Sequence, residues 1–187
     1  GPVSFELIGG RFGPVSVNGH EVWHGIAFLF RDENWCTPEP IFEKVEHQAV
    51  EGRFSLQLEG YIPGVSSGES GEFFEGPRIE LHIQVKGDAD GQLHFLARAT
   101  PTHDLLTNRC GWVLMHPTSA AGAAVEIEHV DGRTSRSTFP EEVPAWPPFV
   151  GVCGVRHEYA SGYWAEAQLK GEVYELEDQR NNADLSF

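Results

Sequence analysis

The stretch Ile79-Glu80-Leu81-His82-Ile83-Gln84-Val85 alternates apolar and polar side chains at every position. Successive side chains of a β-strand point to opposite faces, so this period of two predicts a strand with one face in a hydrophobic core and the other in water. Residues 54–59 and residues 93–98 show the same alternation. We therefore predict half-buried strands at all three places.

Turn signals separate the alternating segments. Asn18-Gly19 and Asp131-Gly132 are typical hairpin dipeptides, and residues 86–91 contain two glycines and two aspartates. Successive strands can therefore return antiparallel to one another. No window keeps a helical period, and we expect further strands near residues 3–7, 21–30, 112–115, 124–130, 152–158, 164–170 and 173–177.

This pattern predicts an all-β fold, an antiparallel β-sandwich, because a sheet with one apolar face must cover that face with another sheet. We expect a sandwich of the mutarotase-like supersandwich type, with a closed barrel as the alternative. A chain of 187 residues suits a single domain, which we place at residues 3–187. The opening Gly1-Pro2 resembles a purification-tag scar. Residues 62–77 and the proline-rich residues 140–149 are expected to be loops.

The charge balance excludes several classes of partner. Lys and Arg number 13 and Asp and Glu number 28, giving a formal net charge of -15. A polyanion would be repelled, which argues against nucleic acid and anionic membrane. The longest apolar run, residues 25–30, is far shorter than the roughly 20 residues that span a bilayer. Cys36, Cys110 and Cys153 are odd in number and widely spaced, so we predict a cytoplasmic protein.

Two sequence motifs match catalytic patterns without the required context. His20-Glu21-Val22-Trp23-His24 spells the zinc-protease pattern, but it follows a hairpin turn, and strand positions four apart are separated by about 13 Å. Gly64-Val65-Ser66-Ser67-Gly68 spells the nucleophile elbow, but a loop surrounds it. We interpret both matches as accidental and predict no metal site and no cofactor.

The segment around residue 109 is the first candidate for a polar site. Asn108 and Arg109 stand at the start of a predicted strand and His116 at its end. Arg109 can bind a carboxylate or hydroxyls, Asn108 can donate and accept hydrogen bonds, and His116 could transfer a proton near neutral pH. In the alternative interpretation, Arg109 pairs with Asp178 or Glu177 and only stiffens the sandwich.

Two further clusters combine charged, amide and aromatic side chains, as sugar and carboxylate sites do. The first contains Arg31, Asp32 and Trp35, whose flat ring could face a sugar or could simply fill the core. The second lies in the tail. We predict that both clusters and the residue 109 segment share one site, with catalytic candidates His116, Glu177 and Arg109 and with ligand-binding candidates Arg31, Asp32, Trp35, Asn108, Asp178, Arg180 and Asn181.

Four blocks of the chain resemble the amino-terminal β-domain of the D-apionate lactonase family. They are residues 25–35, residues 107–117, Phe139-Pro140 with Pro147-Pro148-Phe149, and residues 175–181, of which the last is the most specific. The family pattern continues with tryptophan, threonine and alanine where this chain has Asn182, Ala183 and Leu185. In the family a TIM barrel follows this domain, and we expect none within residues 1–187. The resemblance implies a TIM-barrel partner, as a further domain or a separate chain.

The resemblance implies a sugar-lactone-associated β-domain of a lactonase-like hydrolase that binds a small sugar lactone or sugar acid. If the site is catalytic, side-chain chemistry assigns water activation to His116 or Glu177 and oxyanion stabilisation to Arg109 or Arg180. A non-catalytic carbohydrate-binding or interaction module is one alternative. A mutarotase-like or epimerase-like sandwich enzyme is another, by analogy of fold.

Overall fold

A computed structural model describes residues 2–64, 78–180 and 186–187 of the chain. Over these residues the protein is all-β, with antiparallel sheets and one short 3-10 turn, η1 (Thr118–Ala120). The β-sandwich expected from the sequence is confirmed. The alternative of a closed barrel is wrong, because no sheet closes on itself and each ends in edge strands. No helix in the described ranges has the length and apolar character to cross a bilayer.

Contacts divide the chain into two compact units, which we describe one at a time. Unit 1 comprises Gly1–Gly13 and Ile26–Val113, and unit 2 comprises Pro14–Gly25 and Leu114–Phe187. The sequence expectation of one domain over residues 3–187 stays a prediction, as does the mutarotase-like subtype of the sandwich.

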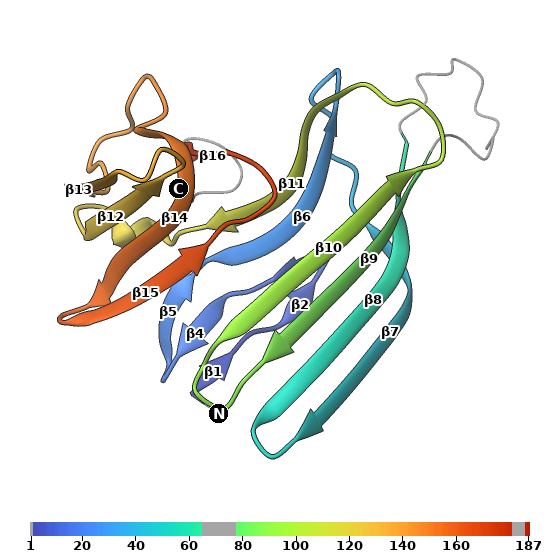
Figure 1. Ribbon diagram of the computed structural model, residues 1–187, viewed down its shortest axis with the longest axis horizontal. Coiled ribbons are helices and arrows are strands. Elements are labelled where there is room, and N and C mark those ends of the chain that lie inside the picture. Colours follow the sequence, from blue (N-terminus) through green and yellow to red (C-terminus); the bar gives the residue numbers. More distant parts are fainter. Residues whose placement is uncertain (1, 65–77, 181–185) are drawn as a thin grey trace. The chain divides into compact units, whose positions relative to one another are not determined.

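The main sheet of unit 1 has four long antiparallel strands in the order β10-β9-β8-β7 (Figure 1). They are β7 (Ile41–Val50), β8 (Arg53–Pro63), β9 (Arg78–Gly87) and β10 (Leu93–Pro101). The register pairs Leu58 with Ile83 and Ile83 with Ala97, so the apolar side chains of neighbouring strands share one face. Burial of that face supplies the hydrophobic driving force for the sheet.

The second sheet of unit 1 covers this apolar face. Its order is β11-β6-β3-β2, from β2 (Leu7–Ile8), β3 (Arg11–Phe12), β6 (Gly25–Asp32) and β11 (Thr107–Met115), and β1 (Val3–Ser4) precedes it. Phe95 of β10 lies 5.4 Å from Phe12 and 5.6 Å from Trp112, measured between ring centroids. Aromatic rings from both sheets therefore interdigitate in one core, as in a β-sandwich.

Gly87 shows how closely side chains pack at the end of the main sheet. It pairs with Phe54 across β8 and β9, and a Cβ at residue 87 would lie 2.0 Å from the Phe54 ring. Only glycine leaves room for the ring to lie over the backbone. Phe54 in turn contacts Phe5, at 5.6 Å between ring centroids, which extends the aromatic core of unit 1.

The main sheet of unit 2 is antiparallel, with its strands in the order β13-β12-β14-β15. Its strands are β12 (Ala124–His129), β13 (Thr134–Thr138), β14 (Phe149–Ala160) and β15 (Tyr163–Gln168), and β16 (Tyr174–Leu176) pairs with the beginning of β14. A short hairpin, β4 (Val15–Val17) and β5 (His20–Trp23), turns at Asn18-Gly19, where both residues have positive φ. The turn predicted there is confirmed. The unit 2 core contains Val22, Val125, Ile127, Phe139 and Val155.

Candidate functional site

The predicted site residues fall into two groups that belong to different units. Unit 1 contains Arg31, Asp32, Trp35, Asn108 and Arg109, whereas unit 2 contains His116, Glu177, Asp178 and Arg180. Asn181 lies outside the described residues, as does most of the Gly64–Gly68 motif. Each group is therefore considered within its own unit, and the single shared site stays a prediction.

A tight turn at the end of β6 is organised by Asp32. Its Oδ1 accepts hydrogen bonds from the backbone N–H groups of Asn34 at 2.8 Å and Cys36 at 2.9 Å. Its carbonyl oxygen accepts the Trp35 N–H at 3.1 Å, and its own N–H donates to the Cys36 carbonyl at 3.0 Å. Trp35 has a φ of 66°, a left-handed conformation that non-glycine residues adopt only when the surrounding contacts hold it.

The first residues of β11 fix this turn from the neighbouring strand. The Asn108 side-chain amide donates to the carbonyl oxygens of Asp32 and Glu33, both at 3.1 Å. The Thr107 hydroxyl donates to the Arg31 carbonyl oxygen at 2.9 Å. Segments 76 residues apart in sequence are thus joined by side chains to backbone, and the turn is held in one conformation.

Trp35 and Arg109 form the exposed surface of this arrangement. The Trp35 side chain is 58% exposed, and the Arg109 guanidinium carbon lies 5.8 Å from the centre of its ring. Arg109 also donates from Nη1 to the Asn108 carbonyl oxygen at 3.1 Å. An aromatic face beside a guanidinium can stack on the C–H face of a sugar ring and donate to a carboxylate or lactone oxygen. We name Trp35 and Arg109 the Trp-Arg surface.

His116 lies in a closed aromatic box in unit 2. Its ring centroid is 4.8 Å from that of Trp23, 4.8 Å from that of Phe139 and 5.0 Å from that of His157. His116 and His157 are 2% and 1% exposed. His116 Nδ1 and both ring nitrogens of His157 have no hydrogen-bond partner among the described residues.

Burial keeps both imidazoles of this box uncharged near neutral pH. Loss of hydration lowers the pKa of His116 well below 6.5, and the neighbouring His157 lowers it further. Burial also lowers the pKa of His157, to about 4, against a weaker opposing effect of the Val22 backbone. His157 was not predicted as a site residue, although its period-two spacing from the apolar Val155 and Cys153 was a signal that it faces the core.

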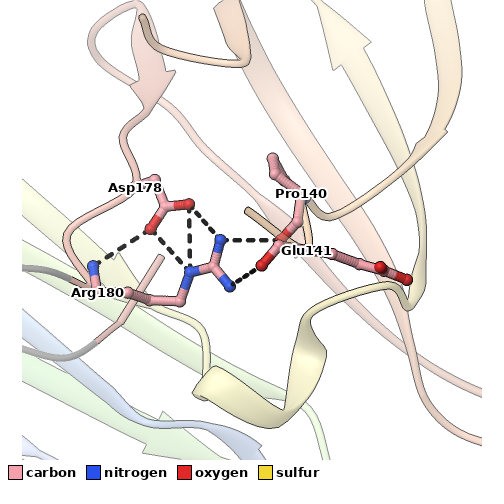
Figure 2. Close-up of polar contacts among 4 residues, drawn as sticks. All are labelled: Pro140, Glu141, Asp178 and Arg180. Carbon is pink, nitrogen blue, oxygen red and sulfur yellow. Dashed lines mark hydrogen bonds and ion pairs between the residues drawn. The ribbon is translucent and has the colours of Figure 1, made fainter. Parts of the chain in front are cut away.

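Asp178 and Arg180 join the tail to the loop that follows β13 (Figure 2). Arg180 Nη2 lies 2.7 Å from Asp178 Oδ2, and the side chains of the pair are 13% and 2% exposed. Arg180 also donates to the carbonyl oxygens of Pro140 at 2.9 Å and Glu141 at 3.0 Å. Its guanidinium carbon lies 4.2 Å from the centre of the buried Phe187 ring. We name the Asp178–Arg180 pair and its two carbonyl contacts the tail latch.

Charge and hydrogen bonding in the tail latch determine the ionisation of Asp178. Burial raises the pKa of this carboxyl group, but the hydrogen bonds and charge of Arg180 outweigh burial and bring the pKa below 3.8. Asp178 is therefore an anion at neutral pH. The neighbouring Glu177 is half-buried and accepts a hydrogen bond from Gln179 Nε2 at 2.8 Å.

Metal-binding geometry is not found in the described part of the chain, where no three His, Cys, Asp or Glu side chains are grouped to hold an ion. The zinc-protease motif lies on strand β5 and just beyond it, which is the context expected from the sequence. His24 Nδ1 contacts the Glu21 carboxylate at 2.8 Å.

Comparison with known families matches residues 1–187 to the family described as "D-apionate lactonase, N-terminal domain". The chain belongs to this family. A curated relative of the lactonase-family domain, the D-apionate lactonase of Brucella anthropi, is 29% identical over 188 residues, which cover 100% of this chain and 29% of the relative. The chain thus spans less than a third of that protein's length. The comparison with solved structures finds none that matches this chain.

Proposed function

We propose that this domain is the β-domain of a sugar lactonase and that it binds a small sugar lactone or the sugar acid formed by ring opening. Family membership and the name of the Brucella anthropi relative support the choice of ligand class. The observation that carries the proposal is the Trp-Arg surface. It offers an apolar ring face and a hydrogen-bonding cation on one rigid turn, which are the two kinds of contact that a sugar lactone or acid requires.

Preorganisation of the turn strengthens this proposal. The Asp32 carboxylate accepts two backbone N–H groups and Asn108 holds two backbone carbonyl oxygens. The backbone that carries Trp35 is therefore already ordered before a ligand binds, so binding costs little conformational entropy of the turn. Because the Trp35 face is open to water, we expect a Kd of about 1 mM, which corresponds to about -4 kcal/mol.

Isothermal titration calorimetry with five-carbon and six-carbon aldonolactones and aldonates tests this proposal. Trp35→Ala should weaken binding of both ligand forms by about tenfold or more, since stacking is lost for each. Arg109→Gln should weaken the aldonate more than the lactone, because only the aldonate carries a full negative charge. Trp146→Ala, at an exposed tryptophan of unit 2, is the matched control and should bind like wild type. Unchanged binding by Trp35→Ala would exclude this surface.

A catalytic role for His116, Glu177 and Arg109 is a separate proposal with its own test. Buried and neutral, His116 is poorly placed to exchange a proton with a ligand in water, so we favour binding as the role of residues 1–187. Under this proposal the remainder of a longer lactonase would supply the catalytic groups. Hydrolysis of the same lactones by wild type, Arg109→Ala and His116→Ala would decide the point, and rates equal to those in buffer would end the catalytic proposal.

A further inference from the structure

The loop that joins β13 to β14 presents the most exposed large apolar side chain of the described residues. Trp146 is 82% exposed, and Val143 of the same loop is 37% exposed. A tryptophan in this position would normally be buried in a core, because its ring is the largest apolar surface of any side chain. Its exposure on a folded loop is typical of a contact site for another molecule.

This loop is stiff, and contacts with residues 174–180 hold both of its ends in place. Pro140, Pro144, Pro147 and Pro148 restrict its backbone. At the first end, the tail latch holds the carbonyl oxygens of Pro140 and Glu141. At the second end, β16 pairs with the beginning of β14, with Phe149 opposite Leu176. A side chain on such a loop can bind a partner with little loss of conformational entropy.

Three further exposed valines lie at the end of the sheet where β14 begins, directly after the loop. Val130, Val150 and Val173 are 56%, 59% and 63% exposed. The Val130 N–H donates to the Gly151 carbonyl oxygen at 2.9 Å, and Val150 pairs with Glu175, two residues after Val173. The three valines therefore lie on neighbouring segments of one sheet end. We name Val130, Val143, Trp146, Val150 and Val173 the docking patch.

Four glutamates, which we name the acidic rim, lie close in sequence to Trp146 and Val173. Glu141 and Glu142 precede Trp146, Glu172 and Glu175 flank Val173, and all four residues are exposed. Residues 138–155, which contain the loop, have no Lys or Arg, whereas Arg133 and Lys170 each lie three residues from a valine of the patch; the whole chain carries a formal charge of -15. Two copies of the protein meeting through this patch would bring their acidic rims together, which disfavours self-association. Charge complementarity selects a partner with basic residues at the contact.

We propose that the docking patch binds a protein surface in which an apolar pocket receives Trp146 and Lys or Arg side chains border that pocket. Tryptophan anchors in desolvated pockets contribute most of the binding energy at such interfaces. The carboxylates of Glu141 and Glu142 pair with the basic border and accelerate encounter. The tail latch positions the loop, so the tail of the chain controls this contact.

Site-specific photo-cross-linking in cells that naturally make the protein tests this proposal. Trp146→p-benzoylphenylalanine places the cross-linker in the patch, and Tyr163→p-benzoylphenylalanine places it at an aromatic that is 65% exposed outside the patch. Mass spectrometry identifies the cross-linked peptide. A further variant combines the cross-linker at residue 146 with Glu141→Lys and Glu142→Lys, which reverses the charge next to Trp146. Thermal unfolding verifies that each variant is folded.

We expect a cross-link from position 146, and not from position 163, to a Lys- or Arg-rich peptide that does not belong to residues 1–187. The charge reversal should reduce its yield about tenfold or more. The purified captured protein should bind wild type at least about tenfold more tightly than Trp146→Ala. Cross-linking to a second copy, equal yields at 146 and 163, insensitivity to the charge reversal, or no cross-link would each overturn the proposal.

Discussion

Mild acid should destabilise unit 2, because the aromatic box contains two buried imidazoles that fold in the neutral form. Unfolding returns His116 and His157 to water, where the ordinary pKa is 6.5. The unfolded chain therefore binds more protons than the folded chain while the pH lies between the unfolded pKa of 6.5 and the lowered pKa values of the folded state. The stabilisation from these groups is complete above the unfolded pKa and is lost as the pH falls.

The size of the effect follows from the pKa of His157. A fall from 6.5 to about 4 corresponds to about 3 kcal/mol once the pH lies below both values, at roughly 1.4 kcal/mol for each pKa unit. At pH 5.0 about 2 kcal/mol of this is already lost, and His116 adds to the loss in the same direction. Compared with a total of about 5–15 kcal/mol for a domain, the change is large.

Urea unfolding between pH 7.5 and pH 5.0, followed by tryptophan fluorescence, measures this loss. Trp23 contacts both imidazoles and should report on the box directly. His157→Phe keeps a ring in place without a titrating group, so its free energy of unfolding should fall by about 2 kcal/mol less than that of wild type over this range. His94→Gln, on the exposed face of β10, should behave like wild type. An equal pH dependence in wild type and His157→Phe would refute the reasoning.

Other changes test the contacts that hold each unit. Arg180→Met should lower the free energy of unfolding by about 3 kcal/mol because it leaves the Asp178 carboxylate buried without its cation, and adding Asp178→Asn should recover part of that loss in the same urea assay. Asn108→Ala should lower the unfolding free energy by about 1–2 kcal/mol and speed hydrogen exchange at the Trp35 amide, and unchanged exchange would contradict its role in the turn. Gly60→Ala should lower the melting temperature, because the added Cβ would lie 2.0 Å from the Ile41 carbonyl oxygen. A normal melting temperature would contradict this close packing of β8 against β7.

Strands whose apolar side chains alternate with polar ones could be predicted from the sequence, whereas two almost fully exposed edge strands could not. β9 and β10 follow the alternation seen at residues 79–85 and 93–98, because the core requires an apolar side chain at every second position. β7 and β13 were not predicted. Both lie at a sheet edge, and nearly all their residues are exposed, so burial imposes no alternation on them.

Residues 21–30 were predicted as one strand, but the chain forms β5 up to Trp23 and begins β6 at Gly25. Between them the His24 N–H donates to the Met115 carbonyl oxygen at 2.7 Å. The pattern of apolar residues is the same whether or not the backbone changes its hydrogen-bond partner, so the break between β5 and β6 could not be predicted from it. The division of the chain into two compact units at this point was likewise invisible in the sequence.

Local parts of the candidate site could be predicted, and contacts distant in sequence could not. Asp32 organises a turn of its immediate neighbours, and Asp178 pairs with Arg180 two residues away. In contrast, Asn108 holds backbone carbonyl oxygens near residue 32, and Arg180 holds that of Pro140. A carbonyl group is present at every residue, so a side chain that binds one leaves no complementary residue type to recognise.

Nuclear magnetic resonance of the Trp35 indole N–H during titration with an aldonate is the most direct test of sugar-acid binding by this domain. We expect the Trp35 resonance to shift in a saturable manner while the Trp146 indole, which is 82% exposed in unit 2, stays unchanged. Trp35→Ala assigns the resonance by removing it, and the shift of the Trp35 indole should weaken in Arg109→Gln. A Trp35 resonance that does not move at several millimolar aldonate would contradict the proposed function.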